Sequence, residues 1–191
     1  MTPLPPGPFG CILADPAWRF RTWSETNQAK SASRHYDLME IEEMAAIPVS
    51  DVAARDCVLL MWVINPMLPH ALRLIDAWGF KQKTVAFTWA KRTPRDTAWH
   101  IGLGYWTRQN TEQCLLATRG KPKRLPSATN VPQLLVAPRR EHSRKPDEQY
   151  ERIERLVGGP YLELFARQSR PGWSSWGNET DKFDELQGVF A

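Results

Sequence analysis

Short apolar runs that end at a proline divide the chain into predicted strands. Gly10–Ala14 is followed by Asp15-Pro16. The longer run Cys57–Ile64 is followed by Asn65-Pro66. An unbroken apolar run is typical of a strand covered on both faces of a parallel sheet, and proline interrupts such strands. Further strands are predicted at residues 84–89, 113–118, 133–137 and 161–166.

Apolar residues at helical spacing separate several of these strands. The spacing predicts a helix over Pro69–Trp78, with Gly79 at its C-terminal end, and a short helix over Glu40–Ile47. Pro146 and the acids behind it predict a helix over 146–157, and a last helical stretch is predicted after Asn178. Strands alternating with helices indicate an α/β fold with a mostly parallel sheet.

The remaining stretches are predicted loops at 19–36, 91–108 and 120–132. With 191 residues, 42% hydrophobic and 24% charged, the chain has ordinary globular composition. Its length predicts a single domain over residues 1–191. A glycine-rich dinucleotide motif and a P-loop are both missing, which argues against a common dinucleotide or nucleoside triphosphate site.

Cysteines and histidines show no metal-binding pattern. Cys11, Cys57 and Cys114 each lie in an apolar run, and the four histidines are scattered. We therefore expect buried thiols in a reducing compartment and no metal site. No signal peptide and no apolar run of membrane-spanning length occurs, so the sequence predicts a cytoplasmic protein with no membrane partner.

Positive charge is concentrated in one part of the chain. The net charge is +4, but residues 119–145 hold eight basic side chains and a single acid, Glu141. A basic segment interrupted by prolines is typical of a surface that binds nucleic acid or another anion, although a solvated loop remains the alternative. Lys121, Lys123 and Arg124 are the candidate phosphate contacts in this segment.

The tetrapeptide Asp15-Pro16-Ala17-Trp18 has the features of a site for a planar amine. Asp15 ends a buried strand, and the ring of Pro16 fixes the backbone behind it. The Asp15 carboxylate and the Pro16 carbonyl can accept the two hydrogens of an exocyclic amino group, while Trp18 can stack on the ring. The alternative is a loop-capping aspartate beside a core tryptophan. Arg167 marks a second strand end, and ligands of α/β sheets bind at such ends.

This tetrapeptide resembles the Asp-Pro-Pro-Trp signature of adenine amino-methyltransferases. From about Cys11 to Asp181, further segments resemble, in the same order, motifs of one family. It is the family of the eukaryotic mRNA N(6)-adenosine methyltransferase catalytic subunit and its bacterial and phage relatives. The segments are Tyr36–Met39, Leu60–Val63, Ala77–Phe80, Trp89–Lys91, Gly104–Trp106, Glu112–Leu115, Arg119–Pro122, Lys145–Glu148, Glu163–Arg167 and Trp176–Asn178.

The resemblance implies a Rossmann-like fold with helices on both faces of the sheet and S-adenosylmethionine (SAM) as cofactor. The catalytic motif then precedes the cofactor strand, which is a permuted motif order. The residues expected at the cofactor are Asp15, Thr111, Glu163, Leu164, Phe165, Arg167, Asn178 and Glu179. Among these, Asp15 is expected at the methionyl amine, and Glu163 and Arg167 at the ribose.

Two positions depart from the family pattern. Ala17 replaces the second proline of the signature. Thr111 stands where the eukaryotic enzyme has a lysine that grips the methionyl carboxylate, so Arg108 or Lys145 is expected to replace that lysine.

The implied reaction is direct transfer of a methyl group to the exocyclic amine of adenine. Asp15 and the Pro16 carbonyl would hold the amine for in-line attack, so that positioning and electrostatics supply the rate. A base inside a duplex cannot enter such a pocket, so the adenine must be flipped out or single-stranded. The residues expected at the nucleic acid are Trp23, Tyr36, Arg108, Lys121, Lys123, Arg124 and Lys145.

The brevity of the chain favours a bacterial or phage DNA adenine N(6)-methyltransferase, acting as a monomer or homodimer. An RNA adenosine N(6)-methyltransferase is one alternative. A non-catalytic subunit that binds SAM or nucleic acid is the other, although the intact Asp15 and Trp18 argue against it.

Overall fold

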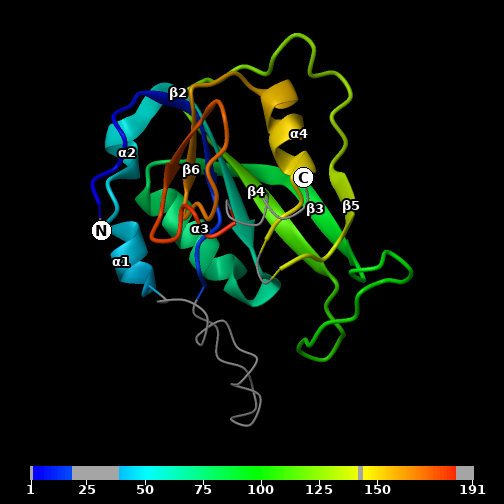
Figure 1. Cartoon of the computed structure of the whole chain (residues 1–191). Coiled ribbons are helices and arrows are strands. Elements are labelled where there is room, and N and C mark those ends of the chain that lie inside the picture. Colours follow the sequence, from blue (N-terminus) through cyan, green and yellow to red (C-terminus); the bar gives the residue numbers. More distant parts are fainter. Residues whose placement is uncertain (1, 19–38, 142–143, 184–191) are drawn as a thin grey trace.

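The computed structural model describes residues 2–18, 39–141 and 144–183. One seven-stranded sheet has the order β5-β3-β4-β2-β1-β6-β7 (Figure 1). Its strands are β1 Phe9–Ala14, β2 Ala53–Val63, β3 Lys81–Arg92, β4 Thr111–Arg119, β5 Leu134–Pro138, β6 Tyr161–Leu164 and β7 Trp173–Trp176. Only β4 runs against its neighbours β2 and β3, whereas every other pair is parallel. The prediction of an α/β fold with a mostly parallel sheet is confirmed.

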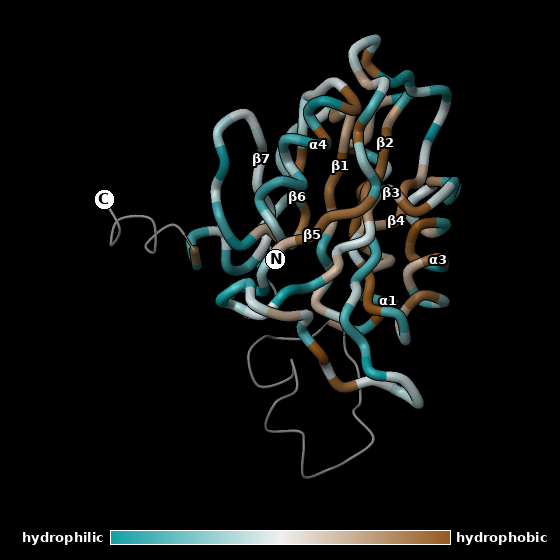
Figure 2. Tube along the Cα trace, turned by 90° about the vertical axis from the view of Figure 1, so that its right-hand side faces the viewer, coloured by the Kyte–Doolittle hydropathy of each residue, from teal (hydrophilic) through white to brown (hydrophobic). Residues whose placement is uncertain are grey.

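Helices cover both faces of the sheet, because successive side chains of a strand point to opposite faces. The helices are α1 Ile41–Ala45, α2 Val49–Val52, α3 Leu68–Ala77, α4 Glu148–Leu156 and the 3-10 helix η3 Asn65–Met67. Ile12 and Leu59 pack in the cluster that contains α1, α2 and α3. Leu13 and Leu60 pack in the second cluster, under α4. Figure 2 shows the hydrophobic residues gathered along the central strands and the inner sides of the helices.

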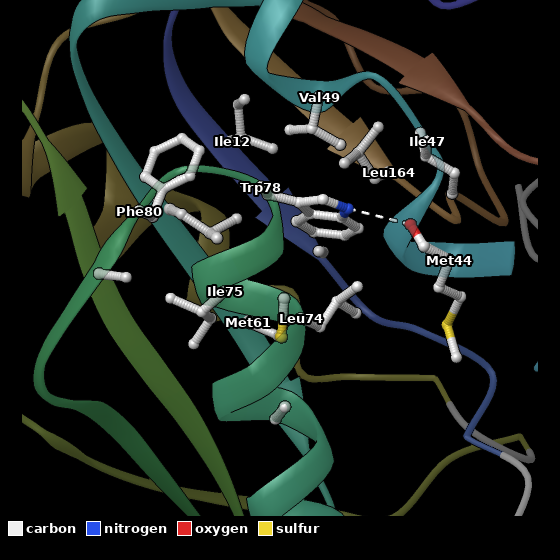
Figure 3. Close-up of a cluster of buried hydrophobic side chains, with 14 of the residues drawn as sticks. Ile12, Met44, Ile47, Val49, Met61, Leu74, Ile75, Trp78, Phe80 and Leu164 are labelled. Carbon is white, nitrogen blue, oxygen red and sulfur yellow. Dashed lines mark hydrogen bonds between the residues drawn. The ribbon is translucent and has the colours of Figure 1, made fainter. Parts of the chain in front are cut away.

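Tryptophans form much of this core. Six of the eight tryptophans in the described residues, from Trp18 to Trp176, are buried. Trp78 at the end of α3 donates its indole N–H to the Met44 carbonyl at 3.0 Å and so joins α3 to α1 (Figure 3). Gly79 follows with φ +80°, as predicted for the glycine behind a helix. The predicted buried thiols are confirmed, since all three cysteines are free and buried.

The structure differs from the predicted elements where apolar residues are scarce. β3 begins at Lys81 because β4 pairs with its exposed, polar first residues. β7 was not predicted, since two serines form its centre, and Arg167 therefore does not follow the last strand. In place of the predicted helix after Asn178, the described part to residue 183 contains only a turn. None of the described helices has the length and apolar character to span a membrane.

Candidate active site

Asp15 follows β1 at the carboxyl ends of the parallel strands, the usual ligand position of such sheets. Its carboxylate is held by Lys145, whose Nζ lies 2.8 Å from Oδ1 and 2.7 Å from Oδ2. Lys145 comes from the segment before α4, far from Asp15 in sequence but beside it in space. The side chain of Lys145 is only 7% exposed, so this ion pair is sheltered from water.

The ion pair continues into a chain of alternating charges. Lys145 Nζ lies 3.4 Å from Glu112 Oε2, and the other oxygen of Glu112 accepts a hydrogen bond from Lys91. Burial by itself raises the pKa of Glu112, but Lys145 and Lys91 outweigh burial and lower it to about 2. Burial likewise lowers the pKa of Lys145, yet Asp15 and Glu112 raise it overall. Glu112 and Lys145 are therefore both charged at neutral pH.

Two tryptophans pack next to this network of charges. Trp18 is 6% exposed and donates its indole N–H to the Trp62 carbonyl at 3.0 Å. The ring of Trp62 lies 5.6 Å from Lys145 Nζ. Trp18 therefore packs in the core, where its indole N–H finds a buried acceptor, and it also lines the larger cavity described below. The sequence alternative of a core tryptophan beside the motif matches this geometry.

Two cavities meet at Asp15. The larger, of about 340 Å³, is bordered by the Asp15–Trp18 loop, Lys91, Glu112 and Arg139. The smaller, of about 30 Å³, lies toward β6 and α4. Both are lined by Asp15, Arg144, Lys145 and Arg167. The carboxylate of Asp15 therefore faces a ligand-sized space on one side and the β6 strand end on the other.

Glu163 is the second acid of the smaller cavity, beside Asp15. Both of its oxygens accept the hydroxyl of Tyr150 at 3.0 Å. Burial raises the pKa of Glu163 to about 7, although the Tyr150 hydrogen bond acts in the opposite direction. Phe165, two residues further, has φ 61°, a left-handed conformation that costs a non-glycine residue about 1–2 kcal/mol. Such strain is concentrated at functional sites.

A match to a family model shows the family to which a chain with this site belongs. The MT-A70 model matches residues 9–179 of the chain. The chain belongs to the MT-A70 family. The match covers all of the strands and every residue of the charge network described above.

Several curated proteins resemble this MT-A70 chain. It is 32% identical to the Type II methyltransferase M.MunI of a Mycoplasma species, over 92% of this chain and 79% of that protein. It is 30% identical to an N(6)-adenosine-methyltransferase MT-A70-like protein of Arabidopsis thaliana, over 91% and 24%. It is 27% identical to the human N(6)-adenosine-methyltransferase catalytic subunit METTL3, over 92% and 29%. The chain thus spans most of the first relative but less than a third of the other two. The prediction of a methyltransferase of this family is confirmed.

Of the residues predicted at the cofactor, the structure brings most to one end of the sheet. Asp15, Glu163, Phe165 and Arg167 line the smaller cavity. Leu164 is buried in the core and Thr111 begins β4 next to Glu112. Glu179 lies 4.0 Å from the Arg167 Nε, and Asn178 precedes it in the chain.

The residues predicted at the nucleic acid are spread more widely. Lys145 lies at the site, and Arg108 is exposed in the loop between β3 and β4. Lys121 and Lys123 border a separate cavity of about 250 Å³ near Gly10 and Gly159, at the opposite end of the sheet. Arg124 follows in the same exposed segment. Trp23 and Tyr36 lie outside the described residues.

Sequence reasoning missed Lys91, Glu112 and Tyr150 as site residues. Lys91 and Glu112 each stand in a quoted motif, but nothing in the sequence pairs them. Their proximity follows from the antiparallel register of β3 and β4, in which Ala90 lies opposite Thr111. No signal in the sequence gives that register, so sequence reasoning could not have found this pair. No group of three or more metal-ligating side chains occurs in the described part of the chain.

Proposed function

We propose that this MT-A70 family member is a SAM-dependent adenine N(6)-methyltransferase that acts on DNA. The observation that carries the proposal is the position of Asp15, whose carboxylate borders both cavities at the carboxyl end of β1. One carboxylate can then contact a cofactor on one side and a base on the other. The relative that the chain matches over most of its length is a Type II methyltransferase, which favours DNA over RNA.

The charged groups of the site fit the chemical groups of SAM. Glu163 ends a strand as a buried acid, which suits a ribose diol. Asp15 suits the methionyl ammonium, and Lys145 or Arg167 suits its carboxylate. Of the two residues considered for the missing lysine, Lys145 lies in the site while Arg108 lies out in an exposed loop. SAM, when bound there, supplies an electrophilic methyl group on a sulfonium.

The chain's own residues then prepare the amine. Its lone pair is delocalised into the adenine ring, so acceptors on both N–H groups favour the pyramidal, nucleophilic form. Asp15 accepts one hydrogen. The Pro16 carbonyl already accepts the Trp18 N–H at 2.8 Å and keeps a second lone pair for the other hydrogen. The hydrogen bond from Lys145 holds the Asp15 carboxylate in place, so positioning and electrostatics supply the rate.

The same site would serve an RNA adenosine N(6)-methyltransferase, because the base and its amine are identical. A non-catalytic subunit would bind SAM or nucleic acid without transfer. With three free, buried thiols, we place the protein in the cytoplasm, as a monomer or homodimer.

Methyl transfer from isotopically labelled SAM tests the proposal directly. The protein is incubated with matched DNA and RNA oligonucleotides, and the labelled nucleoside is identified by mass spectrometry. We expect N(6)-methyladenine in the DNA. Asp15→Ala should lower turnover by about 10²- to 10³-fold, as loss of a positioning group does. Asp76→Ala, which removes an exposed aspartate of α3, is the matched control and should act like wild type.

Three results would contradict parts of the proposal. Label found only in RNA favours the RNA enzyme. Calorimetric SAM binding without transfer to either polymer favours the non-catalytic subunit. Wild-type turnover by Asp15→Ala would show that the site is misplaced.

A further inference from the structure

A loop with exposed apolar side chains stands beside the candidate active site. Of the eight large hydrophobic residues that are exposed in the described chain, five fall within residues 99–106. They are Trp99, Ile101, Leu103, Tyr105 and Trp106, with exposures from 52% to 104%. Single exposed apolar residues are ordinary, but a contiguous group marks an interaction surface. Trp99 and Trp106 are also the only two exposed tryptophans among the described residues.

The backbone of this loop is tied in place. His100 N–H donates to the Lys91 carbonyl at 2.9 Å, and Gly102 N–H donates to the Gln109 carbonyl at 2.8 Å. Trp106 has φ 60°, so its backbone adopts a left-handed conformation that a bulky residue adopts at a cost. The exposed apolar side chains are therefore carried by a loop that backbone hydrogen bonds hold in place, at the expense of local strain.

Both ends of the loop belong to the active site. The loop leaves β3 one residue after Lys91 and enters β4 one residue before Glu112, and these two side chains form an ion pair of the site. The guanidinium of Arg92 lies 4.7 Å from the ring centre of Trp99 and fixes one tryptophan at the base of the loop. Figure 1 shows the loop between β3 and β4 projecting beyond the strands. Lys91 and Glu112, which flank the loop, both line the larger cavity.

Positive charge accompanies the aromatic side chains. Residues 91–110 contain four basic side chains and one acid. Arg95 and Arg108 of this loop are exposed, and Arg139, also exposed, bonds through its N–H to the Arg92 carbonyl at the loop base. Aromatic faces with nearby cations are the combination that binds single-stranded nucleic acid, because bases stack on the rings and phosphates meet the cations.

We propose that residues 99–106 form a stacking platform for the unpaired nucleobases next to the target adenine, with Trp106 as the main stacking side chain. This inference rests on the proposed function, because it concerns the part of the nucleic-acid substrate that lies outside the pocket for the target adenine. A patch that bound another protein copy would need no excess of arginine, whereas a polyanion does. The platform acts on bases and phosphates, so DNA and RNA strands are both tested.

The test is a binding cycle with single-stranded oligonucleotides that carry one adenine. One pair, of DNA and RNA, has ordinary flanking bases, and the second pair has abasic residues at the flanking positions. Binding is measured by fluorescence anisotropy for wild type, Trp106→Ala, Trp106→Phe and the control Leu72→Ala, which truncates an exposed apolar residue of α3. SAM binding and solution mass are measured for each protein.

We expect Trp106→Ala to weaken binding of the ordinary strand by about tenfold or more, the effect of one lost base stack. Trp106→Phe should recover most of the affinity, and Leu72→Ala should change nothing. With abasic flanks, wild type and Trp106→Ala should bind equally. SAM affinity should stay the same in all variants.

Equal affinity of Trp106→Ala and wild type for the ordinary strands would overturn the inference. A change of solution mass with unchanged nucleic-acid affinity would assign the loop to self-association and also overturn it. The binding cycle requires no methyl transfer, so it is independent of the turnover assay. If the proposed function is wrong, the wild-type protein will transfer no methyl group. If only the platform is wrong, the wild-type protein will transfer methyl groups, but Trp106→Ala will bind the ordinary strands as tightly as wild type does.

Discussion

At the scale of single residues, this site places four charges where water is scarce. Asp15, Lys145, Glu112 and Lys91 alternate in sign, so each buried charge has a neighbour of opposite sign. A buried charge without a partner is strongly unfavourable, and the alternation avoids that penalty. Glu163 lies outside this chain of charges, and its hydrogen bond comes from the neutral Tyr150 hydroxyl. Glu112 and Glu163 therefore have pKa values displaced in opposite directions.

The raised pKa of Glu163 predicts that the free energy of unfolding depends on pH. Its folded-state pKa of about 7 lies above the ordinary value of 4.5, so the folded protein binds the extra proton between these pH values. Stability should fall as pH rises through that window, by up to about 3 kcal/mol from this group. Glu163→Gln keeps an acceptor for Tyr150 and removes the titration.

Urea unfolding at pH 5 and pH 8, without cofactor, measures this difference. The drop in unfolding free energy from pH 5 to pH 8 should be smaller in Glu163→Gln than in wild type. Glu112, with its lowered pKa, acts in the opposite sense and contributes stability that is lost only as pH falls from about 4.5 toward 2. An identical pH profile for both proteins would refute the assignment to Glu163.

At the scale of elements, the antiparallel strand β4 decides the shape of the site. It enters the sheet beside β2 and β3 at Thr111 and so carries Glu112 to the end where Asp15 lies. At its other end, Gly120 turns the chain with φ +64°. There the Lys121 N–H donates to Asp56 Oδ1 at 2.7 Å. A side chain at Gly120 would contact Asp56 and the Arg55 carbonyl.

Replacement of this glycine should be more costly than replacement of a glycine with open surroundings. Gly79→Ala is the matched control, because Gly79 also has positive φ but no atom within 4 Å of the added methyl. Gly79→Ala should lose only the strain of about 1–2 kcal/mol. Gly120→Ala should lose more, since backbone must also move. Chemical denaturation of both variants measures the difference, and equal losses would mean that the turn relaxes freely.

At the scale of the whole molecule, the basic segment does not form one surface. Arg139, Arg144 and Lys145 border the larger cavity, whereas Lys121 and Lys123 lie at the opposite end of the sheet. The two groups are separated by the length of β4, whose nine residues span about 30 Å. The sequence alone could not show this, because β5 and its loops carry the chain from one end of the sheet to the other.

The separation predicts which cations an oligonucleotide contacts. With a single strand of about ten nucleotides, Arg139→Gln should reduce the slope of log K against log salt concentration by about 0.7, the value for one lost phosphate contact. Lys123→Gln removes one exposed charge at the opposite end and should leave the slope unchanged. Titrations at several salt concentrations decide between them. A flatter slope for Lys123→Gln would mean that the bound strand extends to the far end, as the basic segment by itself suggests.

The alternation of strands and helices can be predicted from the sequence alone. The apolar residues of β1 and β2 require burial on both faces of the strand, and those of α3 require burial on one face of the helix. Both requirements follow from residues that are close together in the sequence. The sequence also marked Asp15, Glu163 and Arg167 through their motifs. It could not determine β7, whose central serines give no hydrophobic signal and which forms by pairing with β6.

Contacts between distant segments determine which charges meet. Lys145 contacts Asp15 across 130 positions of sequence, and Lys91 contacts Glu112 through the register of two strands. Trp18 and Trp106 have the same side chain, yet Trp18 is buried in the core and Trp106 is fully exposed in the loop between β3 and β4. Packing and register act between distant segments, so a pattern read along the chain can name such residues but cannot place them.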